Sequence, residues 1–156
     1  MSIGDRTAFV LGTWFGCGEA RKAPGTVGSF GAVPVHLWLR GAPIGLHLAA
    51  IVLVTIVGTW AAQRMADRLG QKDPQRVVVD EVAGVLIAMA FVRGHGALAT
   101  SVAFVLFRLL DITKPGPIAR AEHARPVGFG IMADDLAAGL AAGVVARLGL
   151  LAMGAI

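Results

Sequence analysis

The sequence is poor in charge, cysteine and tyrosine, and each shortage narrows what the protein can be. Only 15% of its 156 residues are charged, whereas about 25% is usual in soluble domains. The single cysteine, Cys17, excludes an internal disulfide bond. The lack of tyrosine and the scatter of the basic residues argue against a nucleic-acid partner. A hydrophobic content of 56% and a mean hydropathy of +0.72 point instead to a membrane protein.

Apolar runs of different lengths indicate how the chain would cross a membrane. The longest uncharged run covers residues 41–63 and meets the length of about 20 residues that a spanning helix needs. A second run, 136–156, carries only Arg147 and nearly qualifies. The runs at 82–92 and 94–107 are shorter, so they would span only as parts of longer helices or in a thinned bilayer.

The pattern of the chain favours helices and gives little sign of strands, because alternating runs and Asn-Gly turns are both missing. We therefore predict an all-α fold, a compact membrane-embedded bundle of about six helices that forms a single domain over residues 1–156. Pro34 is expected to kink the second helix. The expected segments are 7–15, 26–40, 44–69, 79–93, 96–113, a short piece before residue 125, and a last helix from about Ala133.

Alternating passages of these helices place three segments, 16–25, 70–78 and 111–134, on one side of the membrane. This side carries most of the basic residues, namely Arg21, Lys22, Arg64, Arg68, Lys72, Arg76, Lys114, Arg120 and Arg125. The positive-inside rule makes it the cytoplasmic side. The same trace gathers five acids there: Asp80, Glu81, Asp111, Asp134 and Asp135.

Two adjacent acidic pairs, Asp80–Glu81 and Asp134–Asp135, open apolar helices. Stabilisation by the helix dipole explains either pair alone. Two pairs on one face, joined by Asp111, would repel one another unless a cation lies between them. Oxygen ligands favour a hard ion such as magnesium, manganese or calcium, and the lack of a His or Cys cluster argues against zinc. We expect such an ion to be held by both pairs, with Asp111 beside them.

Two further motifs could bind phosphate. Arg108, Asp111 and Lys114 recur every third residue, so they share one helical face, either as an internal ion network or as a phosphate-binding group. The glycine-rich turn around Thr26, Gly28 and Ser29 opens a helix, where backbone N–H groups bind phosphate, although an ordinary helix cap has the same composition.

Small residues recur one turn after the acids, at Gly84, Gly139 and Gly143. This spacing lets helices approach closely. The close approach would bring carboxylates of different helices within reach of one ion. Gly139 and Gly143 could equally face a second copy of the chain, so a homo-oligomer is possible on this pattern.

Four motifs together resemble the phosphatidylglycerophosphatase A family. They are "APGTVGS" at 23–29, "VVDEVAG" at 78–84, "FRLLDITKPGPI" at 107–118 and "GFGIMADDLAAG" at 128–139. The resemblance implies an all-helical, magnesium-dependent lipid phosphatase of the bacterial inner membrane. Such an enzyme acts in phospholipid biosynthesis and removes the terminal phosphate of phosphatidylglycerophosphate to leave phosphatidylglycerol. One departure is Gly116, where the family has an aromatic residue.

On this reading the substrate is an anionic phospholipid bound at the cytoplasmic face. The expected catalytic residues are Asp80, Glu81, Asp111, Asp134 and Asp135; all but Asp111 hold the metal, and Thr26, Gly28, Ser29, Arg108 and Lys114 bind the substrate phosphate. The alternative is a small cation carrier or channel subunit that uses the same carboxylates. A transport path would place acids at several depths, whereas the trace places them at one.

Overall fold

A computed structural model describes residues 2–154, which form seven α-helices, one 3₁₀ turn and no strand. This confirms the prediction of an all-helical bundle. The helices are α1 (Ile3–Gly12), α2 (Pro24–Leu39), α3 (Ile44–Leu69), α4 (Val79–Ala90), α5 (Gly96–Thr113), α6 (Gly116–Ala121) and α7 (Val127–Ala152), with the 3₁₀ turn at Cys17–Glu19.

The predicted bounds of α3 and α5 agree with the structure, and those of α7 do not. α7 begins at Val127, not near Ala133, so the acidic pair lies two turns inside the helix. Pro126 precedes the first turn. The free N–H of Gly128 donates to Gln63 Oε1 over 2.8 Å, which satisfies one of the open groups at a helix start. Gly128 lets the start of α7 lie against α3, because a Cβ at this position would collide with the backbone of Thr59 and Gln63.

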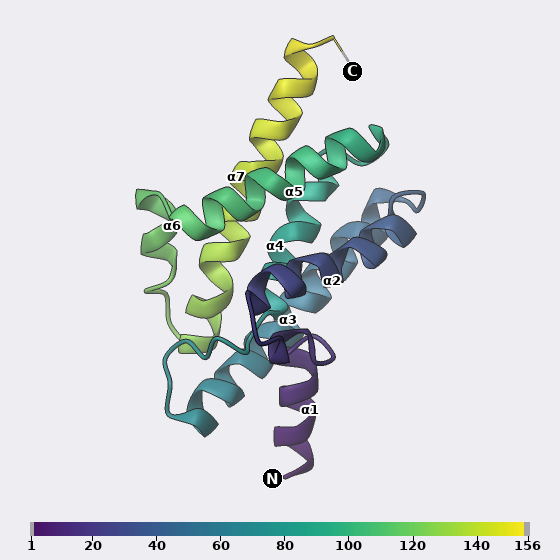
Figure 1. Cartoon of the computed structure of the whole chain (residues 1–156). Coiled ribbons are helices and arrows are strands. Elements are labelled where there is room, and N and C mark those ends of the chain that lie inside the picture. Colours follow the sequence, from purple (N-terminus) through teal and green to yellow (C-terminus); the bar gives the residue numbers. More distant parts are fainter. Residues whose placement is uncertain (1, 155–156) are drawn as a thin grey trace.

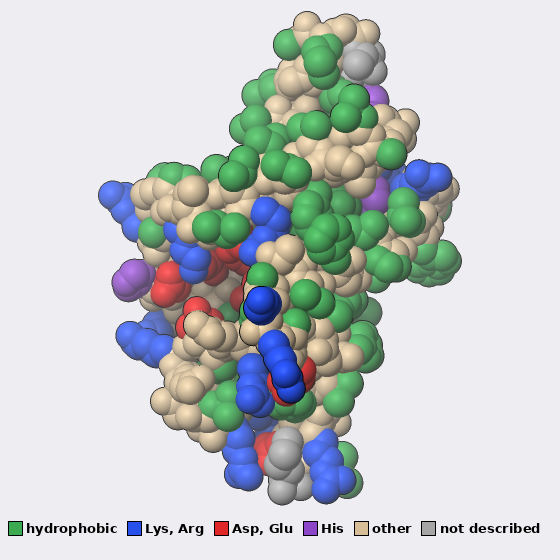
Figure 2. Space-filling model, in the orientation of Figure 1, with side chains coloured by type: hydrophobic (Ala, Val, Ile, Leu, Met, Phe, Trp, Pro, Cys, Tyr) green, Lys and Arg blue, Asp and Glu red, His purple; other side chains and the backbone are tan. Residues whose placement is uncertain are grey.

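Three helices, α3, α5 and α7, are long and apolar enough to cross a membrane. α3 turns large apolar side chains such as Val52, Leu53 and Ile56 outward. Such exposed apolar surface is unusual on a soluble monomer and suits lipid. Figure 2 shows hydrophobic side chains spread over much of the visible face.

The centre of the bundle is built by α4 and α7 (Figure 1), and α7 also packs against α3, α5 and α6. The backbones of the two central helices approach each other closely where Gly84 faces Gly139. A Cβ on Gly139 would stand 2.9 Å from Gly84 Cα, and one on Gly84 would stand 2.7 Å from the carbonyl oxygen of Asp135. Only glycine fits this crossing, which sets the acidic start of α4 beside Asp135.

The remaining predicted small residue, Gly143, packs against Phe91. All three glycines thus serve contacts within one chain. Contacts within the bundle explain the spacing of these glycines. The spacing is therefore no argument for a second copy of the chain.

Candidate metal and phosphate site

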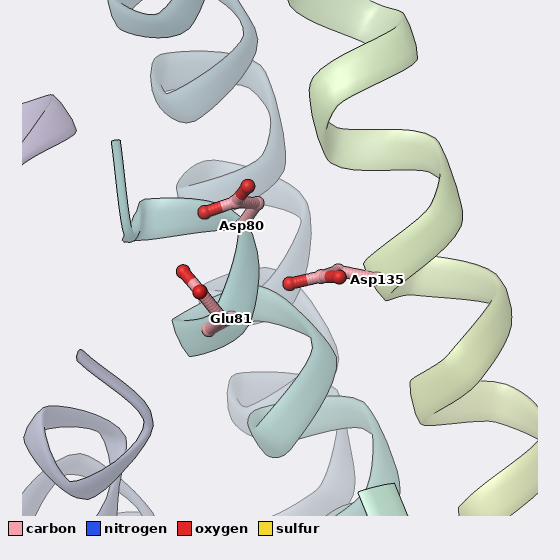
Figure 3. A group of neighbouring side chains, drawn as sticks. All are labelled: Asp80, Glu81 and Asp135. Atoms are coloured by element: carbon pink, nitrogen blue, oxygen red, sulfur yellow. The ribbon is translucent and has the colours of Figure 1, made fainter. Parts of the chain in front are cut away.

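Three carboxylates from two helices meet at one end of the bundle. Asp80 and Glu81 come from the first turn of α4, and Asp135 comes from α7 (Figure 3). One oxygen atom of each lies within 4.8 Å of the others. Asp80 and Asp135 are buried, and Glu81 is partly buried. This trio brings together three of the four predicted metal ligands.

Each carboxylate of the trio has one buried oxygen without a hydrogen-bond partner among the described residues: Asp80 Oδ1, Glu81 Oε2 and Asp135 Oδ2. Unpaired buried acceptors are costly, since folding has removed their water. Three neighbouring carboxylates that each carry such an oxygen fit a hard divalent cation, which takes several oxygen ligands. The arrangement therefore suits Mg²⁺ chemically.

The pKa values of the acids at the start of α4 also favour a bound cation. This helix is not one of the three candidate membrane spans. Burial raises the pKa of the Asp80 carboxyl well above its usual value, and the charges of Glu81 and Asp135 raise it further. Burial also raises the pKa of Glu81, although a side-chain hydrogen bond with Asp80 and the charge of Arg108 each lower it in part. A bound cation would keep these groups ionised at neutral pH.

The neighbouring acid, Asp134, faces elsewhere. Consecutive helix residues point about 100° apart because a turn holds 3.6 residues. Asp134 Oδ2 lies 2.5 Å from Lys114 Nζ, which also lies 3.3 Å from Glu122 Oε2. Burial acts to lower the pKa of Lys114, but the hydrogen bond and charge of Asp134 raise it, so the ammonium stays charged.

Arg108 forms the second cationic group of the site. Its Nη1 lies 2.5 Å from Asp111 Oδ2 and 4.0 Å from Glu81 Oε1. It also donates to Ser29 Oγ over 3.2 Å, and its Nη2 stands 3.5 Å from Thr26 Oγ1. Of the predicted network of Arg108, Asp111 and Lys114, only the Arg108–Asp111 pair is present, because Lys114 pairs with Asp134 and Glu122 instead.

The start of α2 borders these charges closely. A Cβ on Gly25 would collide with Glu81 Oε1 and stand 3.5 Å from Arg108 Nη2. Ser29 is buried, and its hydroxyl donates to the Gly25 carbonyl over 2.8 Å. Gly28 instead packs against Val78. Among the residues predicted for phosphate, Thr26 and Ser29 thus contact Arg108, while Gly28 serves packing.

All these charges line one cavity of about 330 Å³. Figure 2 shows it as a hollow where acidic side chains lie between basic ones. Its wall contains Pro24, Gly25, Asp73, Gln75, Val77, Asp80, Glu81, Arg108, Asp111, Lys114, Glu122, Ile131, Asp134 and Asp135.

Sequence reasoning missed three polar residues of this wall, Asp73, Gln75 and Glu122. Asp73 and Gln75 stand in the loop that leads into the Asp80–Glu81 motif, and this position was the available signal. Glu122 reaches Lys114 only because α6 turns the chain back on itself. No sequence periodicity encodes that return.

Comparison of the sequence with known proteins shows which family the chain matches. The sequence model of the family described as phosphatidylglycerophosphatase A matches residues 10–150, which include all four motifs and the whole cavity wall. The chain belongs to the phosphatidylglycerophosphatase A family. This confirms the resemblance drawn from the four motifs. Within the family frame, the "VVDEVAG" and "MADDLAAG" motifs supply the trio, and the "FRLLDITKPGPI" motif supplies both cations.

Alignments with individual relatives cover most of the chain. Escherichia coli (strain K12) phosphatidylglycerophosphatase A is 31% identical over 141 residues, 90% of this chain and 82% of the relative. The Haemophilus influenzae protein of that name is 34% identical over 137 residues, 87% and 84% of the two chains. A Bacteroides thetaiotaomicron protein, provisionally named phosphatidylinositol-3-phosphatase, is 38% identical over 138 residues, 84% and 86% of the two chains. Comparison with solved structures gave no match.

Proposed function

We propose that this protein is a magnesium-dependent lipid phosphatase of phospholipid biosynthesis. It would hydrolyse the terminal phosphomonoester of phosphatidylglycerophosphate to phosphatidylglycerol and inorganic phosphate. The observation that carries the proposal is the meeting of a buried carboxylate trio with Arg108 and Lys114 in one cavity. Membership of the family and the names of two relatives support the substrate.

The chain's own groups would divide the work. Mg²⁺ held by Asp80, Glu81 and Asp135 would supply positive charge and help to orient water. Arg108 and Lys114 would hold the phosphoryl oxygens and stabilise the charge that develops as the ester P–O bond breaks. Asp111 would hold Arg108 in position, while Asp134 and Glu122 would do the same for Lys114. Asp134 remains a further candidate metal ligand, because its Oδ1 is buried without a partner.

The proposed location is the bacterial inner membrane, with the cavity on its cytoplasmic face. The apolar helices α3, α5 and α7 support the membrane location. The basic residues that surround the cavity support its orientation through the positive-inside rule. The lipid headgroup would then enter the cavity from the cytoplasmic leaflet, and released phosphate would leave to the cytoplasm.

A cation carrier is less compatible with where the acids lie. All ten acidic residues belong to the half of the bundle that holds the cavity, in α1, the 3₁₀ turn, the end of α3 and the segments around the cavity. A transport path needs polar groups at several depths. The described residues offer no acid along the other half.

The substrate can be tested against the alternative that one relative's name suggests. Inorganic phosphate release would be measured in detergent micelles with Mg²⁺, using phosphatidylglycerophosphate or phosphatidylinositol 3-phosphate at equal concentration. We expect kcat/KM to be higher for phosphatidylglycerophosphate. Preference for the inositol lipid would keep the reaction class and reject the substrate, and release from neither lipid by folded protein would reject the phosphatase.

A further inference from the structure

A second, smaller hollow adjoins the cavity. It has a volume of about 100 Å³ and lies between the loop before α4 and the turn that joins α6 to α7. Asp73, Glu122 and Ile131 line both hollows, so the two are direct neighbours. We call the smaller one the rim pocket. Its other lining residues are Lys72, His123, Ala124, Arg125 and Val127.

The rim pocket has an excess of positive charge. Lys72, His123 and Arg125 are exposed, and neither Lys72 nor Arg125 has an ion-pair partner among residues 2–154. One of the pocket's two acids, Glu122, pairs with Lys114 of the cavity. Lys72 and Arg125 therefore outweigh the one acid that remains. At the left of Figure 2, purple and blue side chains border the hollow. Such a pocket suits an anion, and a guanidinium favours phosphate in particular.

One side chain separates the rim pocket from the cation that would hold the terminal phosphate. Glu122 Oε2 lies 3.3 Å from Lys114 Nζ in the cavity, and Glu122 also lines the rim pocket. Phosphatidylglycerophosphate carries a second phosphate, the phosphodiester, which is one glycerol unit away from the terminal phosphate. A terminal phosphate beside Lys114 would therefore leave the phosphodiester within reach of the rim pocket.

The rim pocket also lies at the depth where phospholipid headgroups are expected. Its wall includes Val127, and the next residue, Gly128, donates its N–H to Gln63 Oε1 over 2.8 Å. Gln63 stands about one turn after Trp60 on α3. Trp60 is 41% exposed, and an exposed tryptophan on a spanning helix marks the membrane interface. The start of α7, and the pocket with it, is thus at headgroup level.

A groove on α3 leads from this level toward the bilayer. Its wall includes the outward-facing Ile56, then Trp60, and finally Pro126 from the start of α7. Pro126 stands between Arg125 and Val127, which both line the rim pocket. The apolar end of a lipid bound at the rim pocket would therefore have a path along α3 into the membrane.

We infer that the rim pocket binds the phosphodiester of the lipid substrate through Lys72 and Arg125. The inference rests on the proposed function, and it names the residues that select a headgroup with two phosphates. The terminal phosphate occupies the cavity, the phosphodiester occupies the rim pocket, and Glu122 stands between them. Solvated surface charges would be equally exposed, but they would not distinguish the two halves of the substrate.

The test compares two double variants of the full-length protein in detergent micelles with Mg²⁺. The rim variant combines Lys72→Gln with Arg125→Gln. The control combines Arg68→Gln with Arg120→Gln, which removes two exposed positive charges of the same half of the bundle that line neither hollow. For each protein we would measure kcat and KM with phosphatidylglycerophosphate, and the Tm. The inhibition constants of the two products, phosphatidylglycerol and inorganic phosphate, report separately on the phosphodiester and the terminal phosphate.

We expect the rim variant to raise KM about tenfold, the effect of losing charge-assisted hydrogen bonds to one phosphate. Its kcat and Tm should stay near the wild-type values, because uniform binding is lost and not a contact made only in the transition state. The inhibition constant of phosphatidylglycerol should rise by a similar factor, while that of inorganic phosphate stays unchanged. The control should behave like wild type.

Three results would overturn the inference while the phosphatase proposal stands. They are an unchanged KM in the rim variant, an equal rise of KM in both double variants, and a rise confined to the inhibition constant of inorganic phosphate. The last result would mean that the rim pocket holds the free anion. Absence of release from phosphatidylglycerophosphate by folded wild-type protein would instead reject the proposed function and this inference with it.

Discussion

Asp134 and Asp135 are neighbours in the sequence, but their carboxylates have different partners. Asp135 joins Asp80 and Glu81, whereas Asp134 meets Lys114. Asp135 is therefore suited to holding a metal ion. Asp134 is suited to holding the ammonium of Lys114, which would contact the substrate. The two acids of one motif can therefore be separated by experiment.

We expect Asp135→Asn to reduce kcat/KM by at least about 100-fold and to raise the Mg²⁺ concentration needed for half-maximal activity, because a ligand is lost. Asp134→Asn should cost about tenfold and act mainly on KM for the lipid, because Lys114 loses its orienting partner. Steady-state kinetics over a Mg²⁺ series would separate the two effects. Identical metal dependence in the two variants would contradict this division.

Arg108→Lys keeps the positive charge at this position but replaces the planar guanidinium with an ammonium. Arg108 reaches Asp111, Ser29 and Glu81 from one guanidinium, which an ammonium cannot do. We expect kcat to fall by about 10- to 100-fold, with wild-type thermal stability. The exposed Arg68→Lys serves as the control. Unchanged kcat in Arg108→Lys would remove Arg108 from the site.

The raised pKa of Asp80 makes stability depend on pH. In the metal-free protein the folded state holds this proton more tightly than the unfolded state, so stability is lost as pH rises from the unfolded value near 3.8 through the raised folded value. Acidification from neutral pH should therefore raise the Tm in chelator. Protons also compete with Mg²⁺, so stabilisation by Mg²⁺ should shrink over the same range. A metal-free Tm that falls on mild acidification would contradict the buried trio.

At the scale of helices, the crossing of α4 and α7 positions the trio. Gly139→Ala would push its Cβ against the backbone of Gly84, and overpacking of this kind costs about 1–3 kcal/mol. We expect a lower Tm and weaker Mg²⁺ binding. Gly149→Ala on the same helix is the control, because its Cβ meets nothing within 4 Å and should leave both properties unchanged. Equal effects of the two substitutions would show that the crossing does not matter.

The helices also show what local sequence can predict. The bounds of α3 and α5 follow from long apolar runs ended by Gly70 and by the Pro115 region. The start of α7 was missed because Gly128 serves a contact with α3, which is a tertiary requirement. The sequence could predict the residues of the trio because pairs of adjacent acids are conspicuous within apolar segments. The pairing of Asp134 with Lys114 depends on the side from which α5 meets α7, which hydropathy does not encode.

At the scale of the whole molecule, the uneven charge predicts how the protein sits in the membrane. The cavity end should face the cytoplasm. In a Cys17→Ala background, we expect an impermeant thiol reagent to label His123→Cys in inside-out vesicles and Gly41→Cys in right-side-out vesicles. Both positions are exposed and lie at opposite ends of the bundle. The reverse pattern of labelling would place the cavity outside and remove the proposed access from the cytoplasmic leaflet.

The central claim is that the carboxylate trio makes hydrolysis depend on a divalent cation. Its most direct test is phosphate release from phosphatidylglycerophosphate by wild type and by Asp135→Asn, first in excess chelator and then after Mg²⁺ is restored. We expect wild-type release to stop with chelator and return with Mg²⁺, while Asp135→Asn stays inactive at the Mg²⁺ level that restores wild type. Undiminished release in chelator, or full activity of Asp135→Asn, would contradict the proposed metal site.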